Sequence, residues 1–277
     1  MINQDLLNIY KRPNLGSSSL ILGWSQDVGQ LGPKVIDYLN RKLGTEEIGA
    51  IEPVGFFSLS GVRIEDSTVQ FPESKFYSSE KDDLLILKSS PPMYEQYKFL
   101  NSVLDFAEHY AAVKEVYTIG GLVSLKADTA PQRIATVVNQ PELKEIPKRL
   151  GLRTDLDYQT PPGGRPTLSS FLLWLAKRRN IAGVNLWIEV PFYLAAVEDL
   201  KAIGYALWFL NERFTLNMDF SELDLAIKKQ NVRIKQLKEQ NPEIKKLVEM
   251  LEQGIMLSSD ESEKLAKEMT EFLEKGD

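Results

Sequence analysis

The sequence of 277 residues contains no cysteine and a single histidine, His109. Without cysteine the chain can form no disulfide, no thiolate nucleophile and no cysteine-ligated metal site. One imidazole also cannot supply the several ligands that histidine metal sites use. His109 stands near the end of a segment of helical period, and no Gly-x-Ser-x-Gly motif accompanies it. We therefore expect His109 to be a residue of a last helical turn, where such side chains are favoured, and we predict no catalytic residue.

The chain also lacks an excess of basic residues, with 33 lysines and arginines against 39 aspartates and glutamates and a formal net charge of -6. This balance argues against a nucleic acid as partner. The apolar runs are too short and too often interrupted for a transmembrane helix. Asp5, Lys11 and Arg12 also interrupt the first residues, where a secretory signal would need an apolar stretch. We expect a cytoplasmic protein that binds neither nucleic acid nor a membrane.

Short apolar runs alternate with longer segments of helical period, which is typical of a sheet covered by helices on both faces. The expected strands are residues 19–22, 47–51, 55–59, 84–87, 115–119, 133–138 and 183–188, and the expected helices are 33–42, 93–112, 167–179 and 194–211. A polar, β-branched stretch at 61–83 is typical of small antiparallel strands. The pattern predicts an α/β fold, a three-layer αβα sandwich with a mixed sheet and phosphorylase- or hydrolase-like topology.

The character of the chain changes near residue 219, after which no strand candidate occurs. One apolar stripe there has spacings of 3, 4, 7 and 3 residues, which needs a surface to pack against; its members are Phe220, Leu223, Ile227, Ile234 and Leu237. We predict a main domain of residues 1–218 and a helical appendage of residues 219–277. The stripe is predicted to pack on the main domain or to form an interface with a neighbouring subunit.

Three glycine turns stand where strands give way to helices or loops, at the carboxyl edge where open α/β sheets often bind ligands. The turn at 23–29 fits neither the dinucleotide fingerprint nor the P-loop, and Asp27 places a carboxylate where it can cap a helix. We interpret this turn chiefly as a change of chain direction. A ligand pocket remains an alternative, and its candidate residues are Trp24, Asp27, Gly29, Gly120, Gly121, Gly164, Arg165 and Glu189.

Two further readings of the acidic residues stay open. Glu189, at the end of an apolar strand, can face a pocket and bind a ribose hydroxyl or act as a base, or it can cap a following helix or pair with an arginine. The aspartates at 82–83 and at 155 and 157 can supply oxygens to magnesium, but acids in loops are usually solvated, so we predict no metal and no cofactor.

Five segments in this order resemble the proteasome-assembly-chaperone family, specifically the archaeal and bacterial relatives of its second-subunit type. The resemblance covers roughly residues 17–225, and the segments are "LILGWSQDVGQLGPKVIDYLNRKL", "DDLLILKSSPP", "EVYTIGGLVS", "GGRPTLSSFLLWLAKRRNIAGVNLWIEVPFYL" and "FTLNMDFSELD". It implies an αβα domain similar to nucleoside phosphorylases, a homo-oligomer and no established catalysis. Relatives that act on proteasomes carry a C-terminal hydrophobic-Tyr-any tripeptide, whereas this sequence ends Glu-Lys-Gly-Asp, so we expect no docking through that tripeptide.

The leading hypothesis is thus a non-enzymatic protein-binding or assembly protein that associates with itself, with a trimer as first guess, and that can also bind another protein. The alternative is a nucleoside- or nucleotide-binding enzyme, phosphorylase-like or an ATP-grasp-type ligase. Such an enzyme would use the loops at the carboxyl edge of the sheet, with Asp27, Arg165 and Glu189 in its pocket.

Overall fold

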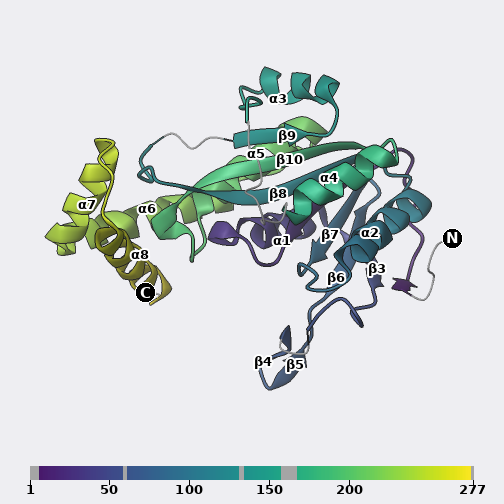
Figure 1. The fold of residues 1–277 in the computed structure, drawn as a ribbon, viewed down its shortest axis with the longest axis horizontal. Coiled ribbons are helices and arrows are strands. Elements are labelled where there is room, and N and C mark those ends of the chain that lie inside the picture. The colour runs from purple at the N-terminus through teal and green to yellow at the C-terminus, as the bar shows by residue number, and fades with distance from the viewer. Residues whose placement is uncertain (1–5, 59–60, 131–133, 157–166, 276–277) are drawn as a thin grey trace. The chain divides into compact units, whose positions relative to one another are not determined.

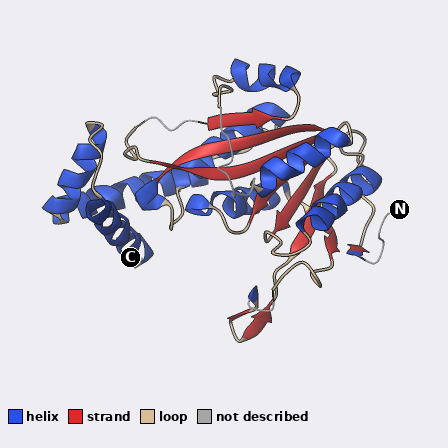
Figure 2. Ribbon diagram, viewed as in Figure 1, coloured by secondary structure: helices blue, strands red, loops and turns tan. Residues whose placement is uncertain are grey.

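The computed structural model describes residues 6–58, 61–130, 134–156 and 167–275. Its main sheet has, among these residues, eight strands in the order β1-β3-β6-β7-β2-β8-β10-β9. Their bounds are β1 Leu7–Ile9, β2 Ser19–Trp24, β3 Glu46–Ile51, β6 Ser74–Ser79, β7 Leu84–Ser89, β8 Glu115–Ser124, β9 Ile134–Val138 and β10 Ala182–Pro191. A separate hairpin joins β4 (Arg63–Glu65) to β5 (Thr68–Gln70). Figure 2 shows the strands in red and the helices in blue.

The sheet is mixed, as the sequence predicts. β2 pairs in parallel with β7 and β8, whereas β6 pairs antiparallel with β3 and β7. Every residue of β2, "SLILGW", is buried, which is typical of a strand covered on both faces. The predicted α/β fold with a mixed sheet is therefore confirmed.

Helices cover both faces of this sheet. They are α1 (Leu31–Leu43), α2 (Gln96–Ala111) and α4 (Leu168–Arg178), while the short helix α3 (Glu145–Arg149) follows β9 along the chain. Figure 1 shows α2 and α4 on one face and α1 on the other. Leu20 and Leu22 of β2 belong to the same apolar core as α2 and α4, while Ile21, between them, points to the opposite face. His109 lies in the last turn of α2, as predicted.

The remaining helices are α5 (Leu200–Phe214), α6 (Ser221–Gln240), α7 (Pro242–Glu252) and α8 (Ser259–Glu274). Short 3₁₀ turns occur at Val28–Gln30 (η2), Pro141–Lys144 (η4) and Phe192–Leu194 (η5). None of the described helices is long and apolar enough to cross a bilayer. After Phe220 the described residues form α6, α7 and α8 with short connections between them, and they include no strand.

Contacts divide the chain into two compact units. The first comprises Met1–Gln26, Gly32–Ile119 and Ala135–Leu186, and the second comprises Asp27–Leu31, Gly120–Ile134 and Trp187–Asp277. The helices after Phe220 therefore share their unit with α5 and with the ends of β8 and β10. The predicted division at residues 218 and 219 stays a prediction about folding domains.

The predicted strand at 55–59 is wrong over residues 55–58, which form a turn and a bend. Gly55 has a φ of 85°, and the Phe56 N–H donates to the carbonyl oxygen of Pro53 at 3.1 Å. The Phe56 carbonyl then accepts the N–H groups of Met93 and Tyr94, so helix α2 begins later than predicted. This turn buries the Phe56 ring against Phe99. The aromatic contact stabilises the turn relative to the extended conformation of a strand.

Candidate functional site

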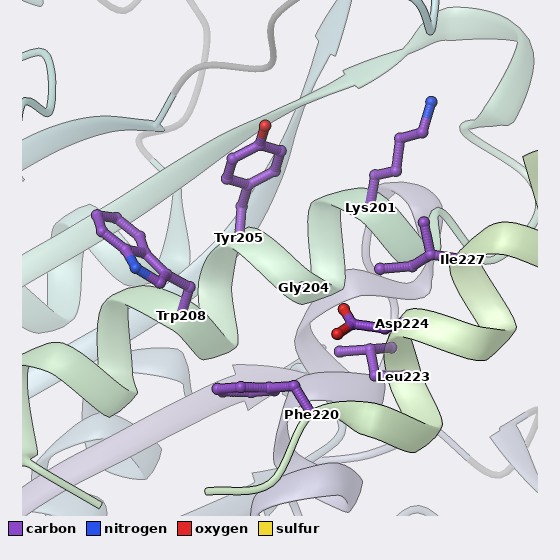
Figure 3. A pocket seen from close by; sticks show the side chains of 8 residues that line it. All are labelled: Lys201, Gly204, Tyr205, Trp208, Phe220, Leu223, Asp224 and Ile227. Atoms are coloured by element: carbon purple, nitrogen blue, oxygen red, sulfur yellow. The ribbon is translucent and has the colours of Figure 1, made fainter. Parts of the chain in front are cut away.

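An apolar groove lies between helices α5 and α6 of the second unit and encloses about 600 Å³. Its lining has the same spacing on both helices, namely i, i+3, i+4 and i+7, so that each helix presents one face to it. The lining residues are Lys201, Gly204, Tyr205 and Trp208 on the α5 side, and Phe220, Leu223, Asp224 and Ile227 on the α6 side. Figure 3 shows these side chains.

Helix α5 begins at a strong local signal. The Asp199 carboxylate caps it by accepting the Ala202 N–H at 3.0 Å. The helix ends at Phe214, and its C-cap Thr215 has a left-handed φ of 53°. The Asn211 side chain then accepts the N–H of Met218 at 2.9 Å. These bonds turn the chain back so that α6 runs beside α5.

Gly204 allows the two helices to approach closely. A Cβ atom built at this position would lie 3.3 Å from Ile227 Cδ1 and 3.8 Å from Leu223 Cδ2. Gln230 fixes the other end of the contact, because its side chain donates to the Glu198 carbonyl at 2.6 Å and accepts the Leu200 N–H at 3.2 Å. The relative position of α5 and α6 is thus determined by packing and by hydrogen bonds.

The groove exposes aromatic side chains. Tyr205 is 41% exposed and Trp208 is 39% exposed, while Leu223 is buried at its floor and Phe220 is half-buried. The polar ends of Lys201 and Tyr205 extend away from Phe220 and Leu223 (Figure 3). The groove therefore offers an apolar floor, two accessible aromatic rings and charged groups at its margin.

A polar cluster contacts the first turn of α5 through Lys201, which also lines the groove. The Lys201 ammonium donates to the Asp128 carbonyl oxygen at 3.1 Å, and the Tyr193 hydroxyl donates to the Asp128 carboxylate at 2.7 Å. Burial raises the pKa of Tyr193 well above its ordinary value, and the negative charge of Asp128 raises this pKa further. The Tyr193 hydroxyl consequently stays protonated and remains a donor throughout the physiological range.

The predicted stripe divides into two parts. Phe220, Leu223 and Ile227 line the groove, whereas Ile234 and Leu237 are buried within the second unit. The stripes of α7 and α8 are also buried there, namely Ile244, Leu247, Val248, Leu251, Leu265 and Met269. The groove is therefore lined by the first three residues of the stripe, and the role of the stripe as a subunit interface stays a prediction.

Sequence reasoning missed Tyr205 and Trp208, although both lie on the same face of α5 as Lys201 and Gly204, with the spacing i, i+3, i+4, i+7.

The predicted pocket residues that are described lie in both units. In the first unit, the Trp24 indole N–H donates to Ser169 Oγ at 3.0 Å, and the indole is buried. In the second, both carboxylate oxygens of Asp27 accept the Gly121 N–H at 3.1 Å, and one also accepts the Val28 N–H at 2.9 Å. Asp27 thus caps the turn η2 and joins it to β8.

Other predicted pocket residues also take part in internal contacts. Gly29 donates its N–H to the Ala195 carbonyl at 2.8 Å, and the ring of Trp187 lies near Gly120. Glu189 accepts a hydrogen bond from Lys126 Nζ at 2.9 Å, so this carboxylate pairs with a lysine and not with the expected arginine. Gly164 and Arg165 lie outside the described residues. A ligand pocket at this edge stays a prediction.

No group of three or more metal-ligating side chains was found in the described part of the chain. Of the aspartates considered for magnesium, Asp82 accepts the Ser79 hydroxyl at 2.6 Å and Asp83 accepts the Gly16 N–H at 3.0 Å. Asp155 accepts the Arg153 side chain at 3.2 Å, and Asp157 lies outside the described residues.

The parallel centre, the antiparallel edge and the helices on both faces define an αβα sandwich protein with a helical extension. The sequence model of the PAC2 family matches residues 20–238. The chain therefore belongs to the PAC2 family. The comparison with curated proteins returned no significant match.

Solved structures share this fold. PbaB of Pyrococcus furiosus, described as an archaeal proteasome activator, is 22% identical with a TM-score of 0.68, covering 84% of this chain and 98% of PbaB. A PAC2 family protein of Streptomyces avermitilis is 19% identical with a TM-score of 0.69, and the match covers 80% of this chain and 96% of that protein. A proteasome-assembly chaperone homologue of Mycobacterium tuberculosis is 14% identical with a TM-score of 0.68, and the match covers 79% of this chain and 94% of that protein. The resemblance found in the sequence is confirmed at the level of family and fold.

Proposed function

We propose that this PAC2-family chain is a non-enzymatic, homo-oligomeric protein-binding factor with a role similar to that of proteasome-assembly proteins. The relatives' descriptions as a proteasome activator and as a proteasome-assembly chaperone homologue support a protein as partner. The observation that carries the proposal is the open groove between α5 and α6. A cytoplasmic location stays a prediction.

The groove has the composition of a protein contact. Tryptophan and tyrosine dominate the binding energy of protein interfaces, and here Trp208 and Tyr205 are both accessible beside a buried aliphatic floor. Neither ring is needed to fix α6 on α5, because Gly204, Ile227 and Gln230 perform that task. We propose that a second copy of the chain covers these rings, so that Phe220, Leu223 and Ile227 act as the subunit contact predicted from the sequence.

The carboxylates assigned to the alternative enzyme have structural partners. Asp27 accepts backbone N–H groups of Val28 and Gly121, and Glu189 accepts the Lys126 ammonium. These bonds support the assembly proposal over the enzyme. A carboxylate that acts as a base or binds a ribose hydroxyl would have to give up these internal bonds to contact the substrate.

Multi-angle light scattering on the full chain tests the proposal. We expect an oligomer, and we expect the double variant Tyr205→Ser/Trp208→Ser to have a lower mass, since it removes both accessible rings. Trp174→Ser is the matched control, because Trp174 is similarly exposed on α4 of the first unit. A monomeric wild type, or a double variant with unchanged mass, would refute self-association through the groove.

A second arm tests the partner. The chain is mixed with purified proteasome α-subunits of the same organism and analysed by size exclusion. Co-elution of the two supports the assembly role, and separate elution at micromolar concentrations argues against it.

A further inference from the structure

A second hollow of about 200 Å³ lies in the second unit and shares no lining residue with the α5–α6 groove. It is formed by the loop after β8, by η5, by the connection between α7 and α8 and by the first turn of α8. The lining residues are Leu125, Lys126, Phe192, Leu251, Gly254, Ile255, Met256, Leu257 and Ser262. We call this surface the α7–α8 patch.

The patch exposes large apolar side chains. Leu125 is 61% exposed, Ile255 is 46% exposed and Met256 is 76% exposed. The turn itself is made by backbone groups. Gly254 has a φ of 75° and donates its N–H to the Leu251 carbonyl at 3.0 Å, and the Ile255 N–H donates to the Met250 carbonyl at 2.8 Å. Polar side chains would serve this connection equally well, so the exposed pair is not explained by folding.

Acidic residues dominate the sequence around the patch. The sequence from Leu247 to Glu263 contains no lysine or arginine, and its five acidic residues are Glu249, Glu252, Asp260, Glu261 and Glu263. Lysines at 245 and 246 attract Glu249 and Glu261 respectively. Negative charge remains at the end of α7 and on the first turns of α8, on both sides of the apolar pair. Lys126, the basic residue in the lining, pairs with Glu189.

We propose that the α7–α8 patch docks a segment of a partner protein in which large apolar side chains are flanked by lysine or arginine. The apolar hollow is smaller than the roughly 300–1,000 Å³ of ordinary small-molecule sites, so one or two side chains fill it better than a cofactor does. Met256 and Ile255 extend the apolar contact, and methionine adapts to irregular partners. The acidic residues on either side then meet the partner's basic groups.

The acidic surroundings also argue against a symmetric contact between copies through this patch. A two-fold contact would bring the same surface of two chains together, and Asp260 and Glu263 of each copy would then face like charges. The inference goes beyond the proposed function, because it concerns another surface and holds whether or not copies associate through the α5–α6 groove.

Fluorescence anisotropy on the full chain tests the inference. The probe is a labelled 14-residue peptide of leucine and lysine arranged with helical period, and the charge control is the same peptide with glutamate in place of lysine. We expect the leucine/lysine peptide to bind in a salt-dependent manner. The double variants Ile255→Ser/Met256→Ser and Asp260→Asn/Glu263→Gln should each weaken its binding about tenfold or more.

Met93→Ser is the matched control, since Met93 is an exposed methionine of the first unit, and its affinity should equal that of the wild type. Unchanged affinity of Ile255→Ser/Met256→Ser would overturn the inference, because binding would then follow from net charge alone. Equal binding of the glutamate peptide would overturn it as well. If the same double variant had a lower mass by light scattering, the patch would join copies of the chain, which also contradicts the inference.

Discussion

The hydroxyl of Tyr193 donates a hydrogen bond to Oδ1 of Asp128 at 2.7 Å and accepts one from the Asp128 backbone N–H at 2.6 Å. Both residues are buried, so each of these groups would be costly to leave without a partner. Lys201 completes the cluster by donating to the Asp128 carbonyl. Since Lys201 also lines the α5–α6 groove, this cluster links the buried part of the second unit to the proposed contact surface.

Replacing Tyr193 with phenylalanine should destabilise the protein by about 1–3 kcal/mol, because a buried carboxylate oxygen and a buried N–H lose their partner. Urea unfolding followed by circular dichroism measures the loss. Tyr205→Phe is the control, since Tyr205 is 41% exposed and its variant should unfold at the wild-type urea concentration. Equal midpoints for Tyr193→Phe and the wild type would show that the cluster contributes nothing to stability.

The start of α8 should make stability depend on pH. Ser258 and Glu261 form a capping box, and hydrogen bonds from the backbone and hydroxyl of Ser258 lower the pKa of Glu261 below its ordinary value. A carboxylate whose pKa is lower in the folded state stabilises the fold above the ordinary pKa of about 4.3, and this contribution is lost as the pH falls through the folded pKa.

Glu261→Gln keeps a capping side chain but removes the titration. Its melting temperature should lie below that of the wild type at pH 7, and the difference should shrink as the pH falls below about 4.3. Thermal unfolding between pH 7 and pH 3 measures this difference. Glu263→Gln serves as the control on the same helix, and a pH-independent gap between Glu261→Gln and the wild type would contradict the prediction.

A thermal-shift screen separates the assembly protein from the enzyme alternative. We expect phosphate, purine nucleosides and ATP to leave the melting temperature unchanged. A ligand present at 100 times its dissociation constant stabilises the folded state by about 2.7 kcal/mol, which such a screen detects readily. A raised melting temperature with any of these compounds would favour the enzyme and the pocket that includes Asp27 and Glu189.

The sequence predicts the central elements of the fold well. β2 is a continuous apolar run and α4 has a single apolar stripe, and both appear within a few residues of their expected bounds. It fails where tertiary contacts decide the local structure. The run 55–59 is apolar enough for a strand, but burial of Phe56 beside Phe99 and the φ of Gly55 produce a turn.

Strand β1 is not expected from the short segment "LNI", and strand β6 is expected only as one of the small antiparallel strands in the stretch 61–83, because its polar segment "SKFYSS" shows little apolar alternation. β1 pairs with β3 and β6 pairs with β7. These pairings stabilise both strands although their own residues have little preference for the extended conformation. The expected helix 194–211 is likewise displaced, because Asp199 caps the helix that begins at Leu200.

The candidate site could be predicted only in part. The spacing of Phe220, Leu223 and Ile227 is visible in the sequence, whereas the face of α5 opposite them is defined by the close approach at Gly204. The α7–α8 patch has a signal in the sequence, namely the two large apolar residues Ile255 and Met256 inside a stretch, Leu247 to Glu263, that has acidic residues and no basic ones. Only the structure shows that Leu125, far away in the sequence, lines the same hollow.

The most direct test of the central claim uses the absence of cysteine, because a single introduced thiol is then a unique label. The rate of maleimide labelling is measured on Tyr205→Cys over a range of protein concentrations, with Tyr94→Cys, an exposed position of the first unit, as control. If copies meet at the α5–α6 groove, labelling of Tyr205→Cys slows as concentration rises while that of Tyr94→Cys stays constant. A concentration-independent rate at Tyr205→Cys would contradict the account.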